Sequence, residues 1–493
     1  MRRLLLSVGL AVCPALAVGQ QSAPAQLSLA DAIALAREHN PAYRQAIHDR
    51  APAGWGVRNA FSGLLLPSLT ASGGLGYSGL GQQRFLTTDF SQSVSTRSSF
   101  YSFDLNWQLS GETLAQPGLT KAQLNAASAD VAGAETNLIT AVTQQYLTVL
   151  QARDNAGVAR QELARNEEFL KLAQARYDVG RASLIDVRQA QVARGTAQVA
   201  LLRAETAVQV ETLRLFQHLG VTPPVDVASV ELTDRFTVQA PPWQLNDLLT
   251  MAEQQNPSLK ALRARERAAS WGVRAARASY GPAVSVSASW SGFTQTLSDI
   301  NPSIAAARAS ASADSASCVY ANAAWFDAST GQSPLDCTPL YFTPQQEQAI
   351  RGQNDSYPFK FTPQPFQARL TVSIPLWSNF SRPLAVSRAR AQQLGLAESV
   401  RARGLQVQTD VNQAYLTLQT AYRAIAIQET SRTAAREQLQ LATERYRVGS
   451  GTFFELLDAQ LAALRAETDY VNAGYDYHKA AAALEAAVGR PLR

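Results

Sequence analysis

The residue types that most often carry chemistry are few in this chain and stand far apart. The four histidines, His39, His48, His218 and His478, have no spacing that would bring them to one metal ion. No glycine-rich loop follows a predicted strand to cradle a phosphate, and no serine elbow joins a strand to a helix. Met251 is the only methionine after the start, too few for a thioether relay that passes copper. The sequence therefore predicts no catalytic centre, metal site or cofactor, and it favours a protein that is not an enzyme.

The balance of charges also argues against one class of function, nucleic-acid binding. The 44 basic and 39 acidic residues nearly cancel, and no basic run is interleaved with aromatic residues. This excludes a typical nucleic-acid binder, whose basic surface must neutralise phosphates. The chain has 493 residues, enough for two or more ordinary domains.

The N-terminus has the three parts of a secretory signal. Two arginines precede an apolar stretch over residues 4–12, and small-residue cleavage sites end at Ala17 and Gly19. An apolar stretch of about nine residues is too short for a membrane-spanning helix, which needs roughly 20. We therefore expect residues 1–19 to be a cleaved signal peptide. No later window is long and apolar enough for such a helix, so the exported chain is expected to be periplasmic, secreted or an outer-membrane β-barrel.

Export would place the remaining cysteines in an oxidising compartment. Cys318 and Cys337 are the only two after the signal, and such a lone pair favours a disulfide over two buried thiols. Cys13 lies inside the signal. Its acylation, as in a lipoprotein, is a weaker alternative because Val12 has the wrong size for the position before a lipidated cysteine.

The chain is one unit written twice. Trp55-Gly56-Val57-Arg58 recurs unchanged 216 residues later as Trp271-Gly272-Val273-Arg274. Arg176-Tyr177-x-Val179-Gly180 recurs 269 residues later as Arg445-Tyr446-x-Val448-Gly449. Because the two shifts differ, the second copy must carry an insertion between these motifs.

The insertion lies near residues 293–365. This stretch is rich in serine, alanine, proline and asparagine and holds both later cysteines, a composition typical of an exposed loop. We therefore divide the mature chain into a first structural repeat over residues 20–242 and a second over residues 243–493, which carries the insertion as an extracellular loop.

Each copy contains one very long helix. Residues 119–177 contain no proline, and their apolar positions recur at three- and four-residue steps. A helix of about 60 residues would be about 90 Å long, and residues 385–446 repeat the pattern. Shorter helices expected at 41–66 and 184–219 would lie antiparallel beside the long one. An elongated coiled coil without a pore is an alternative on this pattern alone.

Two segments in each copy alternate between apolar and polar residues. The alternation is strict over residues 101–109, 284–291 and 366–374. It is weaker over residues 69–80, because glycine is frequent there. A two-residue period puts one face in apolar surroundings and the other in water. About ten residues is the length of a tilted strand that crosses a bilayer. A soluble sandwich is the alternative, although two very long helices would not normally interrupt one.

Four strands are too few to close a barrel, which needs about eight, and open sheet edges are not tolerated in lipid. The missing strands must therefore come from other copies of the chain. Asp104 and Arg369 fall on the polar strand faces, which suits a wide, water-filled interior. Such an interior favours three copies, a homotrimer, over two.

The duplicated motif carries a family resemblance. Tyr-x-Val-Gly with an acidic residue downstream resembles the TolC family of outer membrane efflux proteins, and the resemblance covers essentially the whole mature chain. The motif stands here as Tyr177-x-Val179-Gly180 with Asp186, and as Tyr446-x-Val448-Gly449 with Glu455 and Asp458. The family implies an α+β membrane protein with internal duplication. Its long antiparallel helices form a barrel, and four β-strands per protomer contribute to a trimeric, twelve-stranded transmembrane β-barrel.

The resemblance also implies roles for residues near the two turns. Glu455 and Asp458 match acidic rings that constrict the periplasmic tip. Three apart on a helix, they share one face, and three copies would crowd six carboxylates that favour cations; an ordinary solvated helix face is the alternative. The residues that would meet an adaptor at the tip are Val179, Gly180, Arg181, Val448, Gly449 and Ser450.

A polar link keeps the tip closed in the family. Tyr446 and Asp186 match two partners of this link. The family arginine two residues beyond the motif glycine is absent, and Gly451 stands in its place. We expect Arg447 or Arg181 to substitute for it.

The implied function is the outer-membrane exit duct, or channel-tunnel, of a tripartite efflux pump or type I secretion system. Its partners would be a periplasmic adaptor (membrane fusion) protein, an inner-membrane efflux or ABC transporter and outer-membrane lipid, with the helical part in the periplasm. A periplasmic coiled-coil adaptor or scaffold without a pore is the alternative. It would explain the helices but not the alternating strands. A secreted enzyme is a third and weaker hypothesis.

Overall fold

The computed structural model describes residues 26–85, 88–92, 94–325 and 333–492. The expected signal peptide, with Cys13, lies outside the described residues. The chain divides into two compact units, and each draws on both halves of the sequence. The helical unit holds the residues up to Val57, Gly118–Trp271 and the residues from Arg388 onward, and the sheet unit holds Arg58–Pro117 and Gly272–Ser387.

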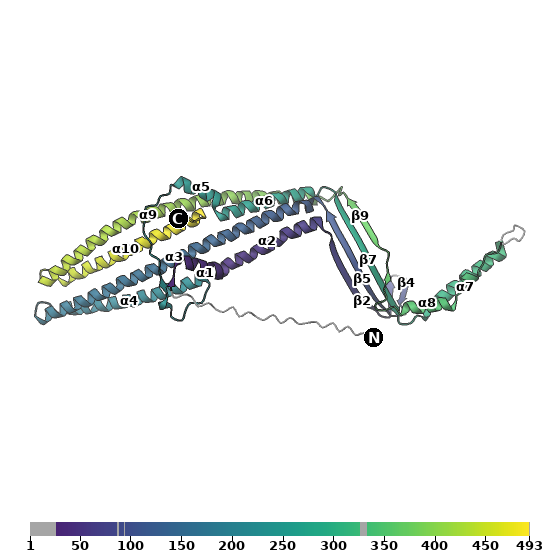
Figure 1. Cartoon of the computed structure of the whole chain (residues 1–493), viewed down its shortest axis with the longest axis horizontal. Coiled ribbons are helices and arrows are strands. Elements are labelled where there is room, and N and C mark those ends of the chain that lie inside the picture. Colours follow the sequence, from purple (N-terminus) through teal and green to yellow (C-terminus); the bar gives the residue numbers. More distant parts are fainter. Residues whose placement is uncertain (1–25, 86–87, 93, 326–332, 493) are drawn as a thin grey trace. The chain divides into compact units, whose positions relative to one another are not determined.

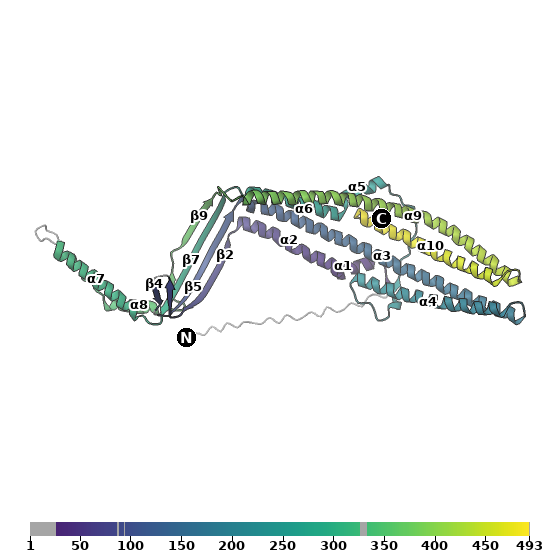
Figure 2. The ribbon, with the colours of Figure 1, turned by 180° about the vertical axis from the view of Figure 1, so that it is seen from behind.

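The helical unit is built from two long helical hairpins (Figures 1 and 2). α3 (Gly111–Asp178) turns back into α4 (Leu184–Leu219), and α9 (Ser381–Val448) turns back into α10 (Phe453–Val488). The two long helices have 68 residues each and the two returning helices 36 each. The repeat in the sequence is therefore a repeat of structure. α3 begins earlier than predicted because it continues through Pro117.

Shorter helices precede each hairpin. α1 (Leu29–His39) and α5 (Leu245–Gln255) each have 11 residues, and they are followed by α2 (Pro41–Leu65) and α6 (Pro257–Ala278). Both later helices start at the proline that follows an asparagine, as expected for a capping residue with proline in the first turn.

Each hairpin has an apolar core where its short helix packs. In the first repeat, Ala36 of α1 lies against Tyr146 of α3 and Leu215 of α4. In the second repeat the corresponding core includes Leu248 and Ala252 of α5, Val411 of α9 and Leu484 of α10. Burying a large apolar side chain of this kind stabilises the fold by about 1.5–3 kcal/mol, so these two cores anchor the short helices to the long ones.

One asparagine and one glycine lock each short helix to its hairpin. Asn40 caps α2 with its side-chain oxygen, and its Nδ2 donates to the His218 carbonyl oxygen at 2.7 Å, near the end of α4. Gly220 then takes a left-handed conformation with φ of 76°, and a Cβ there would lie 2.5 Å from the backbone just before Asn40. Asn256 and Gly489 repeat the arrangement in the second half. Only glycine fits such a close left-handed contact without strain.

The sheet unit contains one antiparallel sheet with strand order β2-β5-β7-β9, and Figure 1 shows these strands side by side. They are β2 (Ser68–Ser78), β5 (Thr96–Leu109), β7 (Ala283–Leu297) and β9 (Gln367–Ser373), with the two-residue β8 (Thr362–Pro363) also paired to β7. The β5–β7 pair joins the first repeat to the second. The four predicted strands are therefore the four main strands of the sheet.

The register gives this sheet one mainly polar face, which also carries Phe100 and Phe293, and one apolar face. Thr70, Asp104, Ser289 and Gln367 lie in one row across the four strands, and Ser289 donates to Asp104 Oδ1 at 2.8 Å. Large exposed side chains on the opposite face include Leu69, Leu75, Tyr77, Phe103, Trp290, Leu370 and Val372. β2 and β9 form the edges, and within the described residues neither has a second strand partner. The sheet is thus two-faced and open at both edges.

The insertion between β7 and β9 is more ordered than predicted. It contains the helices α7 (Asn301–Trp325) and α8 (Pro344–Asn354). We expected an exposed loop from the composition, but much of the segment is helical because residues 303–324 contain neither glycine nor proline and are rich in alanine, the strongest helix former. Arg308 of α7 forms an ion pair with Glu347 of α8 at 3.1 Å. Cys318 and Cys337 form a disulfide that ties α7 to the segment after it.

Two small pairings were not predicted. β1 (Gln26–Leu27) pairs in parallel with β6 (Glu231–Leu232), and β3 (Gly81–Phe85) forms a hairpin with β4 (Thr88–Gln92). Within the described part of the chain, no helix combines enough length and apolar character to cross a membrane. Among the same residues, no three histidine, cysteine or acidic side chains gather closely enough to hold a metal ion.

Candidate functional site at the hairpin turns

Both hairpins reverse through a short turn that needs a left-handed glycine. Gly180 has φ of 73° and Gly449 has φ of 86°, a region that residues with a Cβ rarely adopt. After the first turn, Ser183 caps α4, and Asp186 completes a capping box by accepting the Ser183 N–H at 3.0 Å. After the second turn, Thr452 caps α10. Turn geometry and helix capping therefore explain much of the duplicated motif.

The residues predicted to meet an adaptor lie on these turns. They are Val179, Gly180, Arg181, Val448, Gly449 and Ser450. The two valines occupy matched positions and are 69% and 75% exposed, so each turn presents an apolar side chain outward. Arg176 braces the first turn by donating from Nη2 to the Arg181 carbonyl oxygen at 3.1 Å.

Close to the turns, the two hairpins share one apolar cluster. Its members are Ala173 of α3, Val187 and Ala190 of α4, Tyr446 of α9, and Phe453 and Leu456 of α10. The Tyr446 and Phe453 rings meet edge to face with their centres 5.7 Å apart, a favoured aromatic geometry. Because all four helices contribute, this cluster holds the ends of the hairpins together.

Tyr446 lies at the centre of that contact. Its side chain is buried, and the guanidinium carbon of Arg176 lies 4.5 Å from the centre of its ring. Among the described residues, the Tyr446 hydroxyl and the Nε and Nη1 atoms of Arg176 are buried without a hydrogen-bond partner. Burial raises the pKa of Tyr446 above its ordinary value, the negative charge of Asp186 raises it further, and Arg176 opposes both effects. The contact is therefore one between a cation and a ring, with a carboxylate nearby.

Of the residues predicted to close the tip, two interact with each other and one does not take part. Tyr446 and Asp186 come near enough to interact electrostatically. Arg447 instead forms an ion pair with Glu444 of its own helix at 3.2 Å. The cation beside Tyr446 is Arg176, which sequence reasoning did not single out as a closing residue. The signal that could have found it was the arginine immediately before the motif tyrosine in both copies.

Gly451, which stands where the resemblance leads one to expect an arginine, lies close to its neighbours, so a side chain here would require them to shift by a few tenths of an ångström. A Cβ at this position would lie 3.1 Å from the Arg445 Cβ and 3.3 Å from Glu455 Oε2. Arg445 and Glu455 form an ion pair at 3.6 Å. Both side chains are about half exposed, so the pair contributes about 0–1 kcal/mol to stability.

Glu455 and Asp458 lie on one face of α10, as their spacing predicts. They line a shallow groove against α9, together with Glu437 and Arg445. The structure thus places both acids on an accessible helix face directly after the second turn.

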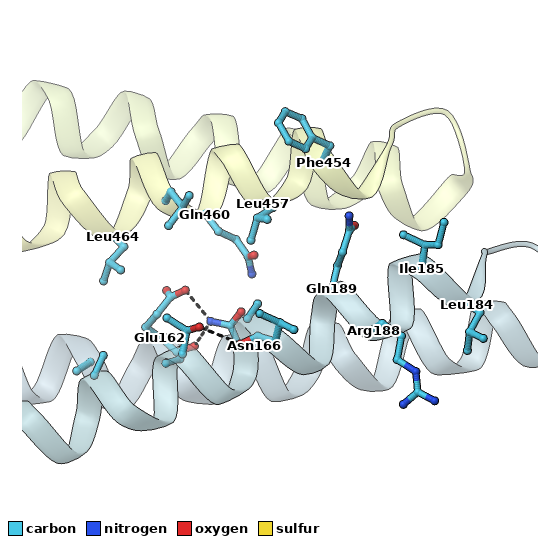
Figure 3. A pocket seen from close by; sticks show the side chains of 17 residues that line it. Glu162, Asn166, Leu184, Ile185, Arg188, Gln189, Phe454, Leu457, Gln460 and Leu464 are labelled. Carbon is cyan, nitrogen blue, oxygen red and sulfur yellow. Dashed lines mark hydrogen bonds between the residues drawn. The ribbon is translucent and has the colours of Figure 1, made fainter.

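An apolar groove of about 730 Å³ lies between the hairpins near the turns (Figure 3). α4 lines it with Ile185 and Val192, and α10 lines it with Phe454 and Leu461; these four side chains are 45–74% exposed. Such a run of exposed apolar side chains is typical of a surface that another helix covers.

Buried polar side chains form the floor of this groove. Figure 3 shows Gln460 of α10 reaching toward Asn166 and Glu162 of α3. Gln460 is 2% exposed, and its Nε2 has no hydrogen-bond partner among the described residues. Asn166 donates to Glu162 Oε1 at 2.7 Å. The groove therefore combines apolar walls with one unused amide donor, which could bond an acceptor that enters from outside.

Comparison with known proteins identifies the family. The model of a family described as outer membrane efflux protein matches residues 32–221 and 345–490, more than half of the chain. The outer membrane efflux protein BepC of Brucella suis biovar 1 (strain 1330) is 28% identical over 155 residues. That match spans 31% of this chain and only 33% of BepC.

Solved structures share the fold. The outer-membrane channel OprN is 18% identical with a TM-score of 0.68, over 94% of this chain and 90% of OprN. VceC of Vibrio cholerae is 17% identical with the same TM-score, over 94% and 97% of the two chains. The CmeC outer membrane channel of Campylobacter jejuni is 14% identical, again at 0.68, over 94% and 85%. These likenesses confirm the predicted fold class, and the family match confirms the predicted relationship: the chain belongs to the outer membrane efflux protein family.

Proposed function

We propose that this protein is the outer-membrane exit duct of a tripartite efflux pump or type I secretion system and that it works as a homotrimer. The observation that carries the proposal is the sheet, with its polar face, its apolar face and its two unpaired edges. An apolar face suits contact with lipid, and a polar face suits a water-filled interior. On this proposal the protein is not an enzyme, since the energy for transport enters at the inner membrane.

The open edges call for further copies of the chain. Unpaired backbone groups find no hydrogen-bond partner in lipid, so β2 and β9 need strands beside them. The antiparallel β5–β7 pair, which joins the two repeats inside one chain, is the template for pairing β9 of one copy with β2 of the next. Three copies then give a closed barrel of about twelve strands, wide enough for an aqueous channel, where about eight strands would be filled by side chains.

A polar network between α3 and α10 supports a ring of helices. Gln151 and Asn155 of α3 both donate to Asn472 of α10, at 2.7 and 3.1 Å, and Tyr475 donates to Asp154 at 2.6 Å. This network joins the first hairpin to the second inside one chain.

The repeat assigns α9 and α4 the same contact at the outer sides of the hairpins. There the apolar side chains Leu202 of α4 and Leu416 and Ile427 of α9 are 59–65% exposed. In a closed ring, α9 of one copy covers α4 of the next, and these side chains become buried.

The turns form the periplasmic entrance on this proposal. Tyr446, Asp186 and Arg176 hold the two hairpins of each copy together in the closed state. Glu455 and Asp458 of three copies line the constriction, where crowded carboxylates favour cations. Opening the entrance requires the two hairpins to separate. The contact between the Arg176 guanidinium and the Tyr446 ring therefore contributes to the free-energy barrier to opening.

The turns and the groove beside them also suit contact with partner proteins. A periplasmic adaptor, coupled to an inner-membrane efflux or ABC transporter, has two features to meet: the exposed valines of the turns and the apolar groove with its unused Gln460 amide. An amphipathic helix fits such a groove, because its apolar face covers the walls and a polar side chain reaches the floor.

Reconstitution of the purified chain tests the proposal. We expect native mass measurement of the membrane-extracted protein to give three copies, and planar bilayers to show a cation-selective conductance. Extraction from membranes by salt alone would favour a periplasmic scaffold and reject the duct. A stable monomer in the bilayer would reject the homotrimer.

A further inference from the structure

The repeated Trp-Gly-Val-Arg motif makes a defined contact in the second repeat. Its tryptophan, Trp271 of α6, lies with the indole ring directly on Gly118 of α3, in the other repeat. A Cβ on this glycine would lie 2.6 Å from two carbon atoms of the ring. Any residue larger than glycine at position 118 would therefore push the tryptophan away, so the two residues fit each other.

Further contacts fix how α6 lies on α3, and we call this contact the inner seam (Figures 1 and 2). Pro257, at the start of α6, lies against Gly133, where a Cβ would be 3.6 Å from the Pro257 Cβ. Arg265 of α6 forms an ion pair with Asp130 of α3 at 2.6 Å. Because later residues of α6 meet earlier residues of α3, the two helices run antiparallel. The small residues on this side of α3 are Gly118, Ala122, Ala126 and Gly133.

The helix α2, which corresponds to α6 in the first repeat, has no such contact in the described part of the single chain. It packs on α3 of its own repeat, where Arg50 Nε donates to Ser128 Oγ at 3.0 Å. No residue of α2 is buried, whereas Ala264 of α6 is 2% exposed. Trp55, the counterpart of Trp271, is 66% exposed. α2 therefore has an open face where α6 has a covered one.

The long helix α9 carries the surface that would match this open face. α3 and α9 are both continuous helices of 68 residues, so the shift of 269 between the repeats holds along them. The counterparts of the four small residues of α3 are Ser387, Ala391, Gly395 and Ala402. All four are small, and all four are exposed in the single chain. A Cβ added at Gly395 would meet only open space, so a neighbouring helix has room to approach closely.

Resting on the proposed homotrimer, we propose that α2 of one copy packs on α9 of the next copy as α6 packs on α3. Trp55 then lies on Ser387 of the neighbour. The occupant of the open face of α2 is a second copy of this chain, because the counterpart of the α3 surface stands on α9 and is uncovered there. The repeated motif is thus used twice, once inside each chain and once between chains. We call the second contact the outer seam.

The outer seam depends more on its tryptophan than the inner seam does. Asp49 and Ser399 stand at the positions where the inner seam has its ion pair, so that charge contact is not repeated. The match also ends toward the sheet, since Phe380 stands in the place of Gly111. Trp55 is therefore the largest side chain that the repeat assigns to the outer seam.

Cross-linking between copies tests the outer seam. The Pro257 and Gly133 positions of the inner seam have a Cβ separation of 3.6 Å, inside the range of about 3.5–4.5 Å that a disulfide needs. Pro41 and Ala402 are their counterparts across the outer seam. The test variant is Pro41→Cys with Ala402→Cys, and the matched control is Pro257→Cys with Gly133→Cys. The native cysteines of the described chain are already joined.

Both variants are oxidised in membranes and compared on denaturing gels without reductant. We expect the test variant to give covalent bands of two and three copies that reductant abolishes, and the control to close its bond within one copy. A control that loses its free thiols beside a test variant that stays at one copy would overturn the outer seam, provided that native mass still gives three copies. A native mass of one copy would count instead against the proposed homotrimer.

Replacing the tryptophan gives a second measurement. Because Trp55 is exposed in the single chain, Trp55→Ala leaves the fold of each copy intact. Loss of a tryptophan from an interface of this kind typically weakens association by roughly 30-fold or more, which native mass measures across a dilution series in detergent. Ser387→Trp should abolish the trimer by occupying the same space, and adding Trp55→Ser should restore it. A trimer that survives both Trp55→Ala and Ser387→Trp would overturn the proposal.

Discussion

The guanidinium of Arg176 covers the buried ring of Tyr446 and so joins the end of one hairpin to the end of the other. The family resemblance leads one to expect a polar link that includes Tyr446 and Asp186, and an arginine at position 451. The arginine that meets Tyr446 comes instead from the first repeat. Gly451, which stands in the expected place, is hemmed in by Arg445 and Glu455. The two arginines at equivalent positions thus differ in role: Arg176 meets a ring in the other hairpin, and Arg445 meets an acid after its own turn.

Replacing Arg176 by glutamine should loosen the closed tip. A cation–ring contact is worth about 0.5–2 kcal/mol, so we expect the open fraction to rise by about 2–30-fold. Single-channel recording in planar bilayers measures this fraction directly. Arg447→Gln is the matched control, since Arg447 forms its ion pair with Glu444 of its own helix and not across the hairpins.

Tyr446→Phe should leave the closed state nearly unchanged. The ring that Arg176 covers is retained, and the hydroxyl has no hydrogen-bond partner among the described residues. Tyr446→Leu removes the ring and should open the channel as Arg176→Gln does. A large opening by Tyr446→Phe would instead show that the hydroxyl holds the closed state through its interaction with Asp186.

Glu455→Gln combined with Asp458→Asn should reduce cation selectivity. Six carboxylates around one axis raise the local cation concentration, and the effect is screened by salt. The reversal potential across a salt gradient should therefore move toward zero, most clearly at low ionic strength. Glu398→Gln, an exposed acid on α9 outside the tip, serves as the control, and an unchanged potential in the double variant would remove both acids from the constriction.

Tyr146 should make stability fall in strongly alkaline solution. It is fully buried, its hydroxyl donates to the Leu27 carbonyl oxygen at 2.9 Å, and burial raises its pKa to about 12. The unfolded chain loses this proton near pH 10, so the stabilisation is complete below about pH 10 and is lost as the pH rises toward 12. Denaturant titrations across this range measure the slope. Tyr146→Phe should flatten it and cost about 1–3 kcal/mol at neutral pH, and an equally steep slope in that variant would contradict the assignment.

Removing the disulfide should affect the insertion alone. Cys318 and Cys337 close a loop with a sequence separation of 19, for which chain entropy gives a stabilisation of about 3 kcal/mol. With both replaced by serine, we expect faster proteolysis between α7 and α8 and an unchanged conductance. Loss of the trimer in this variant would mean that the insertion also supports assembly.

Local signals predicted the elements well. α4 spans the predicted residues because Ser183 caps its start and Gly220 ends it in a left-handed conformation. The strands were visible because their two-residue period reflects two faces that meet different surroundings. The helix α7 was missed because serine and alanine were read as loop formers, although alanine favours helix wherever glycine and proline are absent.

The candidate site was only partly predictable for a different reason. The partner of Tyr446 depends on how two hairpins pack, and Arg176 is 270 residues away from it in the sequence. The rotation of each long helix decides which of several arginines faces the ring, and no local pattern encodes that choice. The unused donor of Gln460 likewise follows from packing between α10 and α3.

The two free edges of the sheet have a consequence for how the proposed trimer forms. A lone chain has two strand edges with unpaired backbone groups. Two joined chains still have two such edges, so the dimer leaves as many edge strands unpaired as the monomer does. Only the third chain removes both at once. Ring closure is therefore a cooperative step that favours complete trimers over partial ones, and a single chain with a blocked β2 edge would act as a dominant inhibitor of its normal companions.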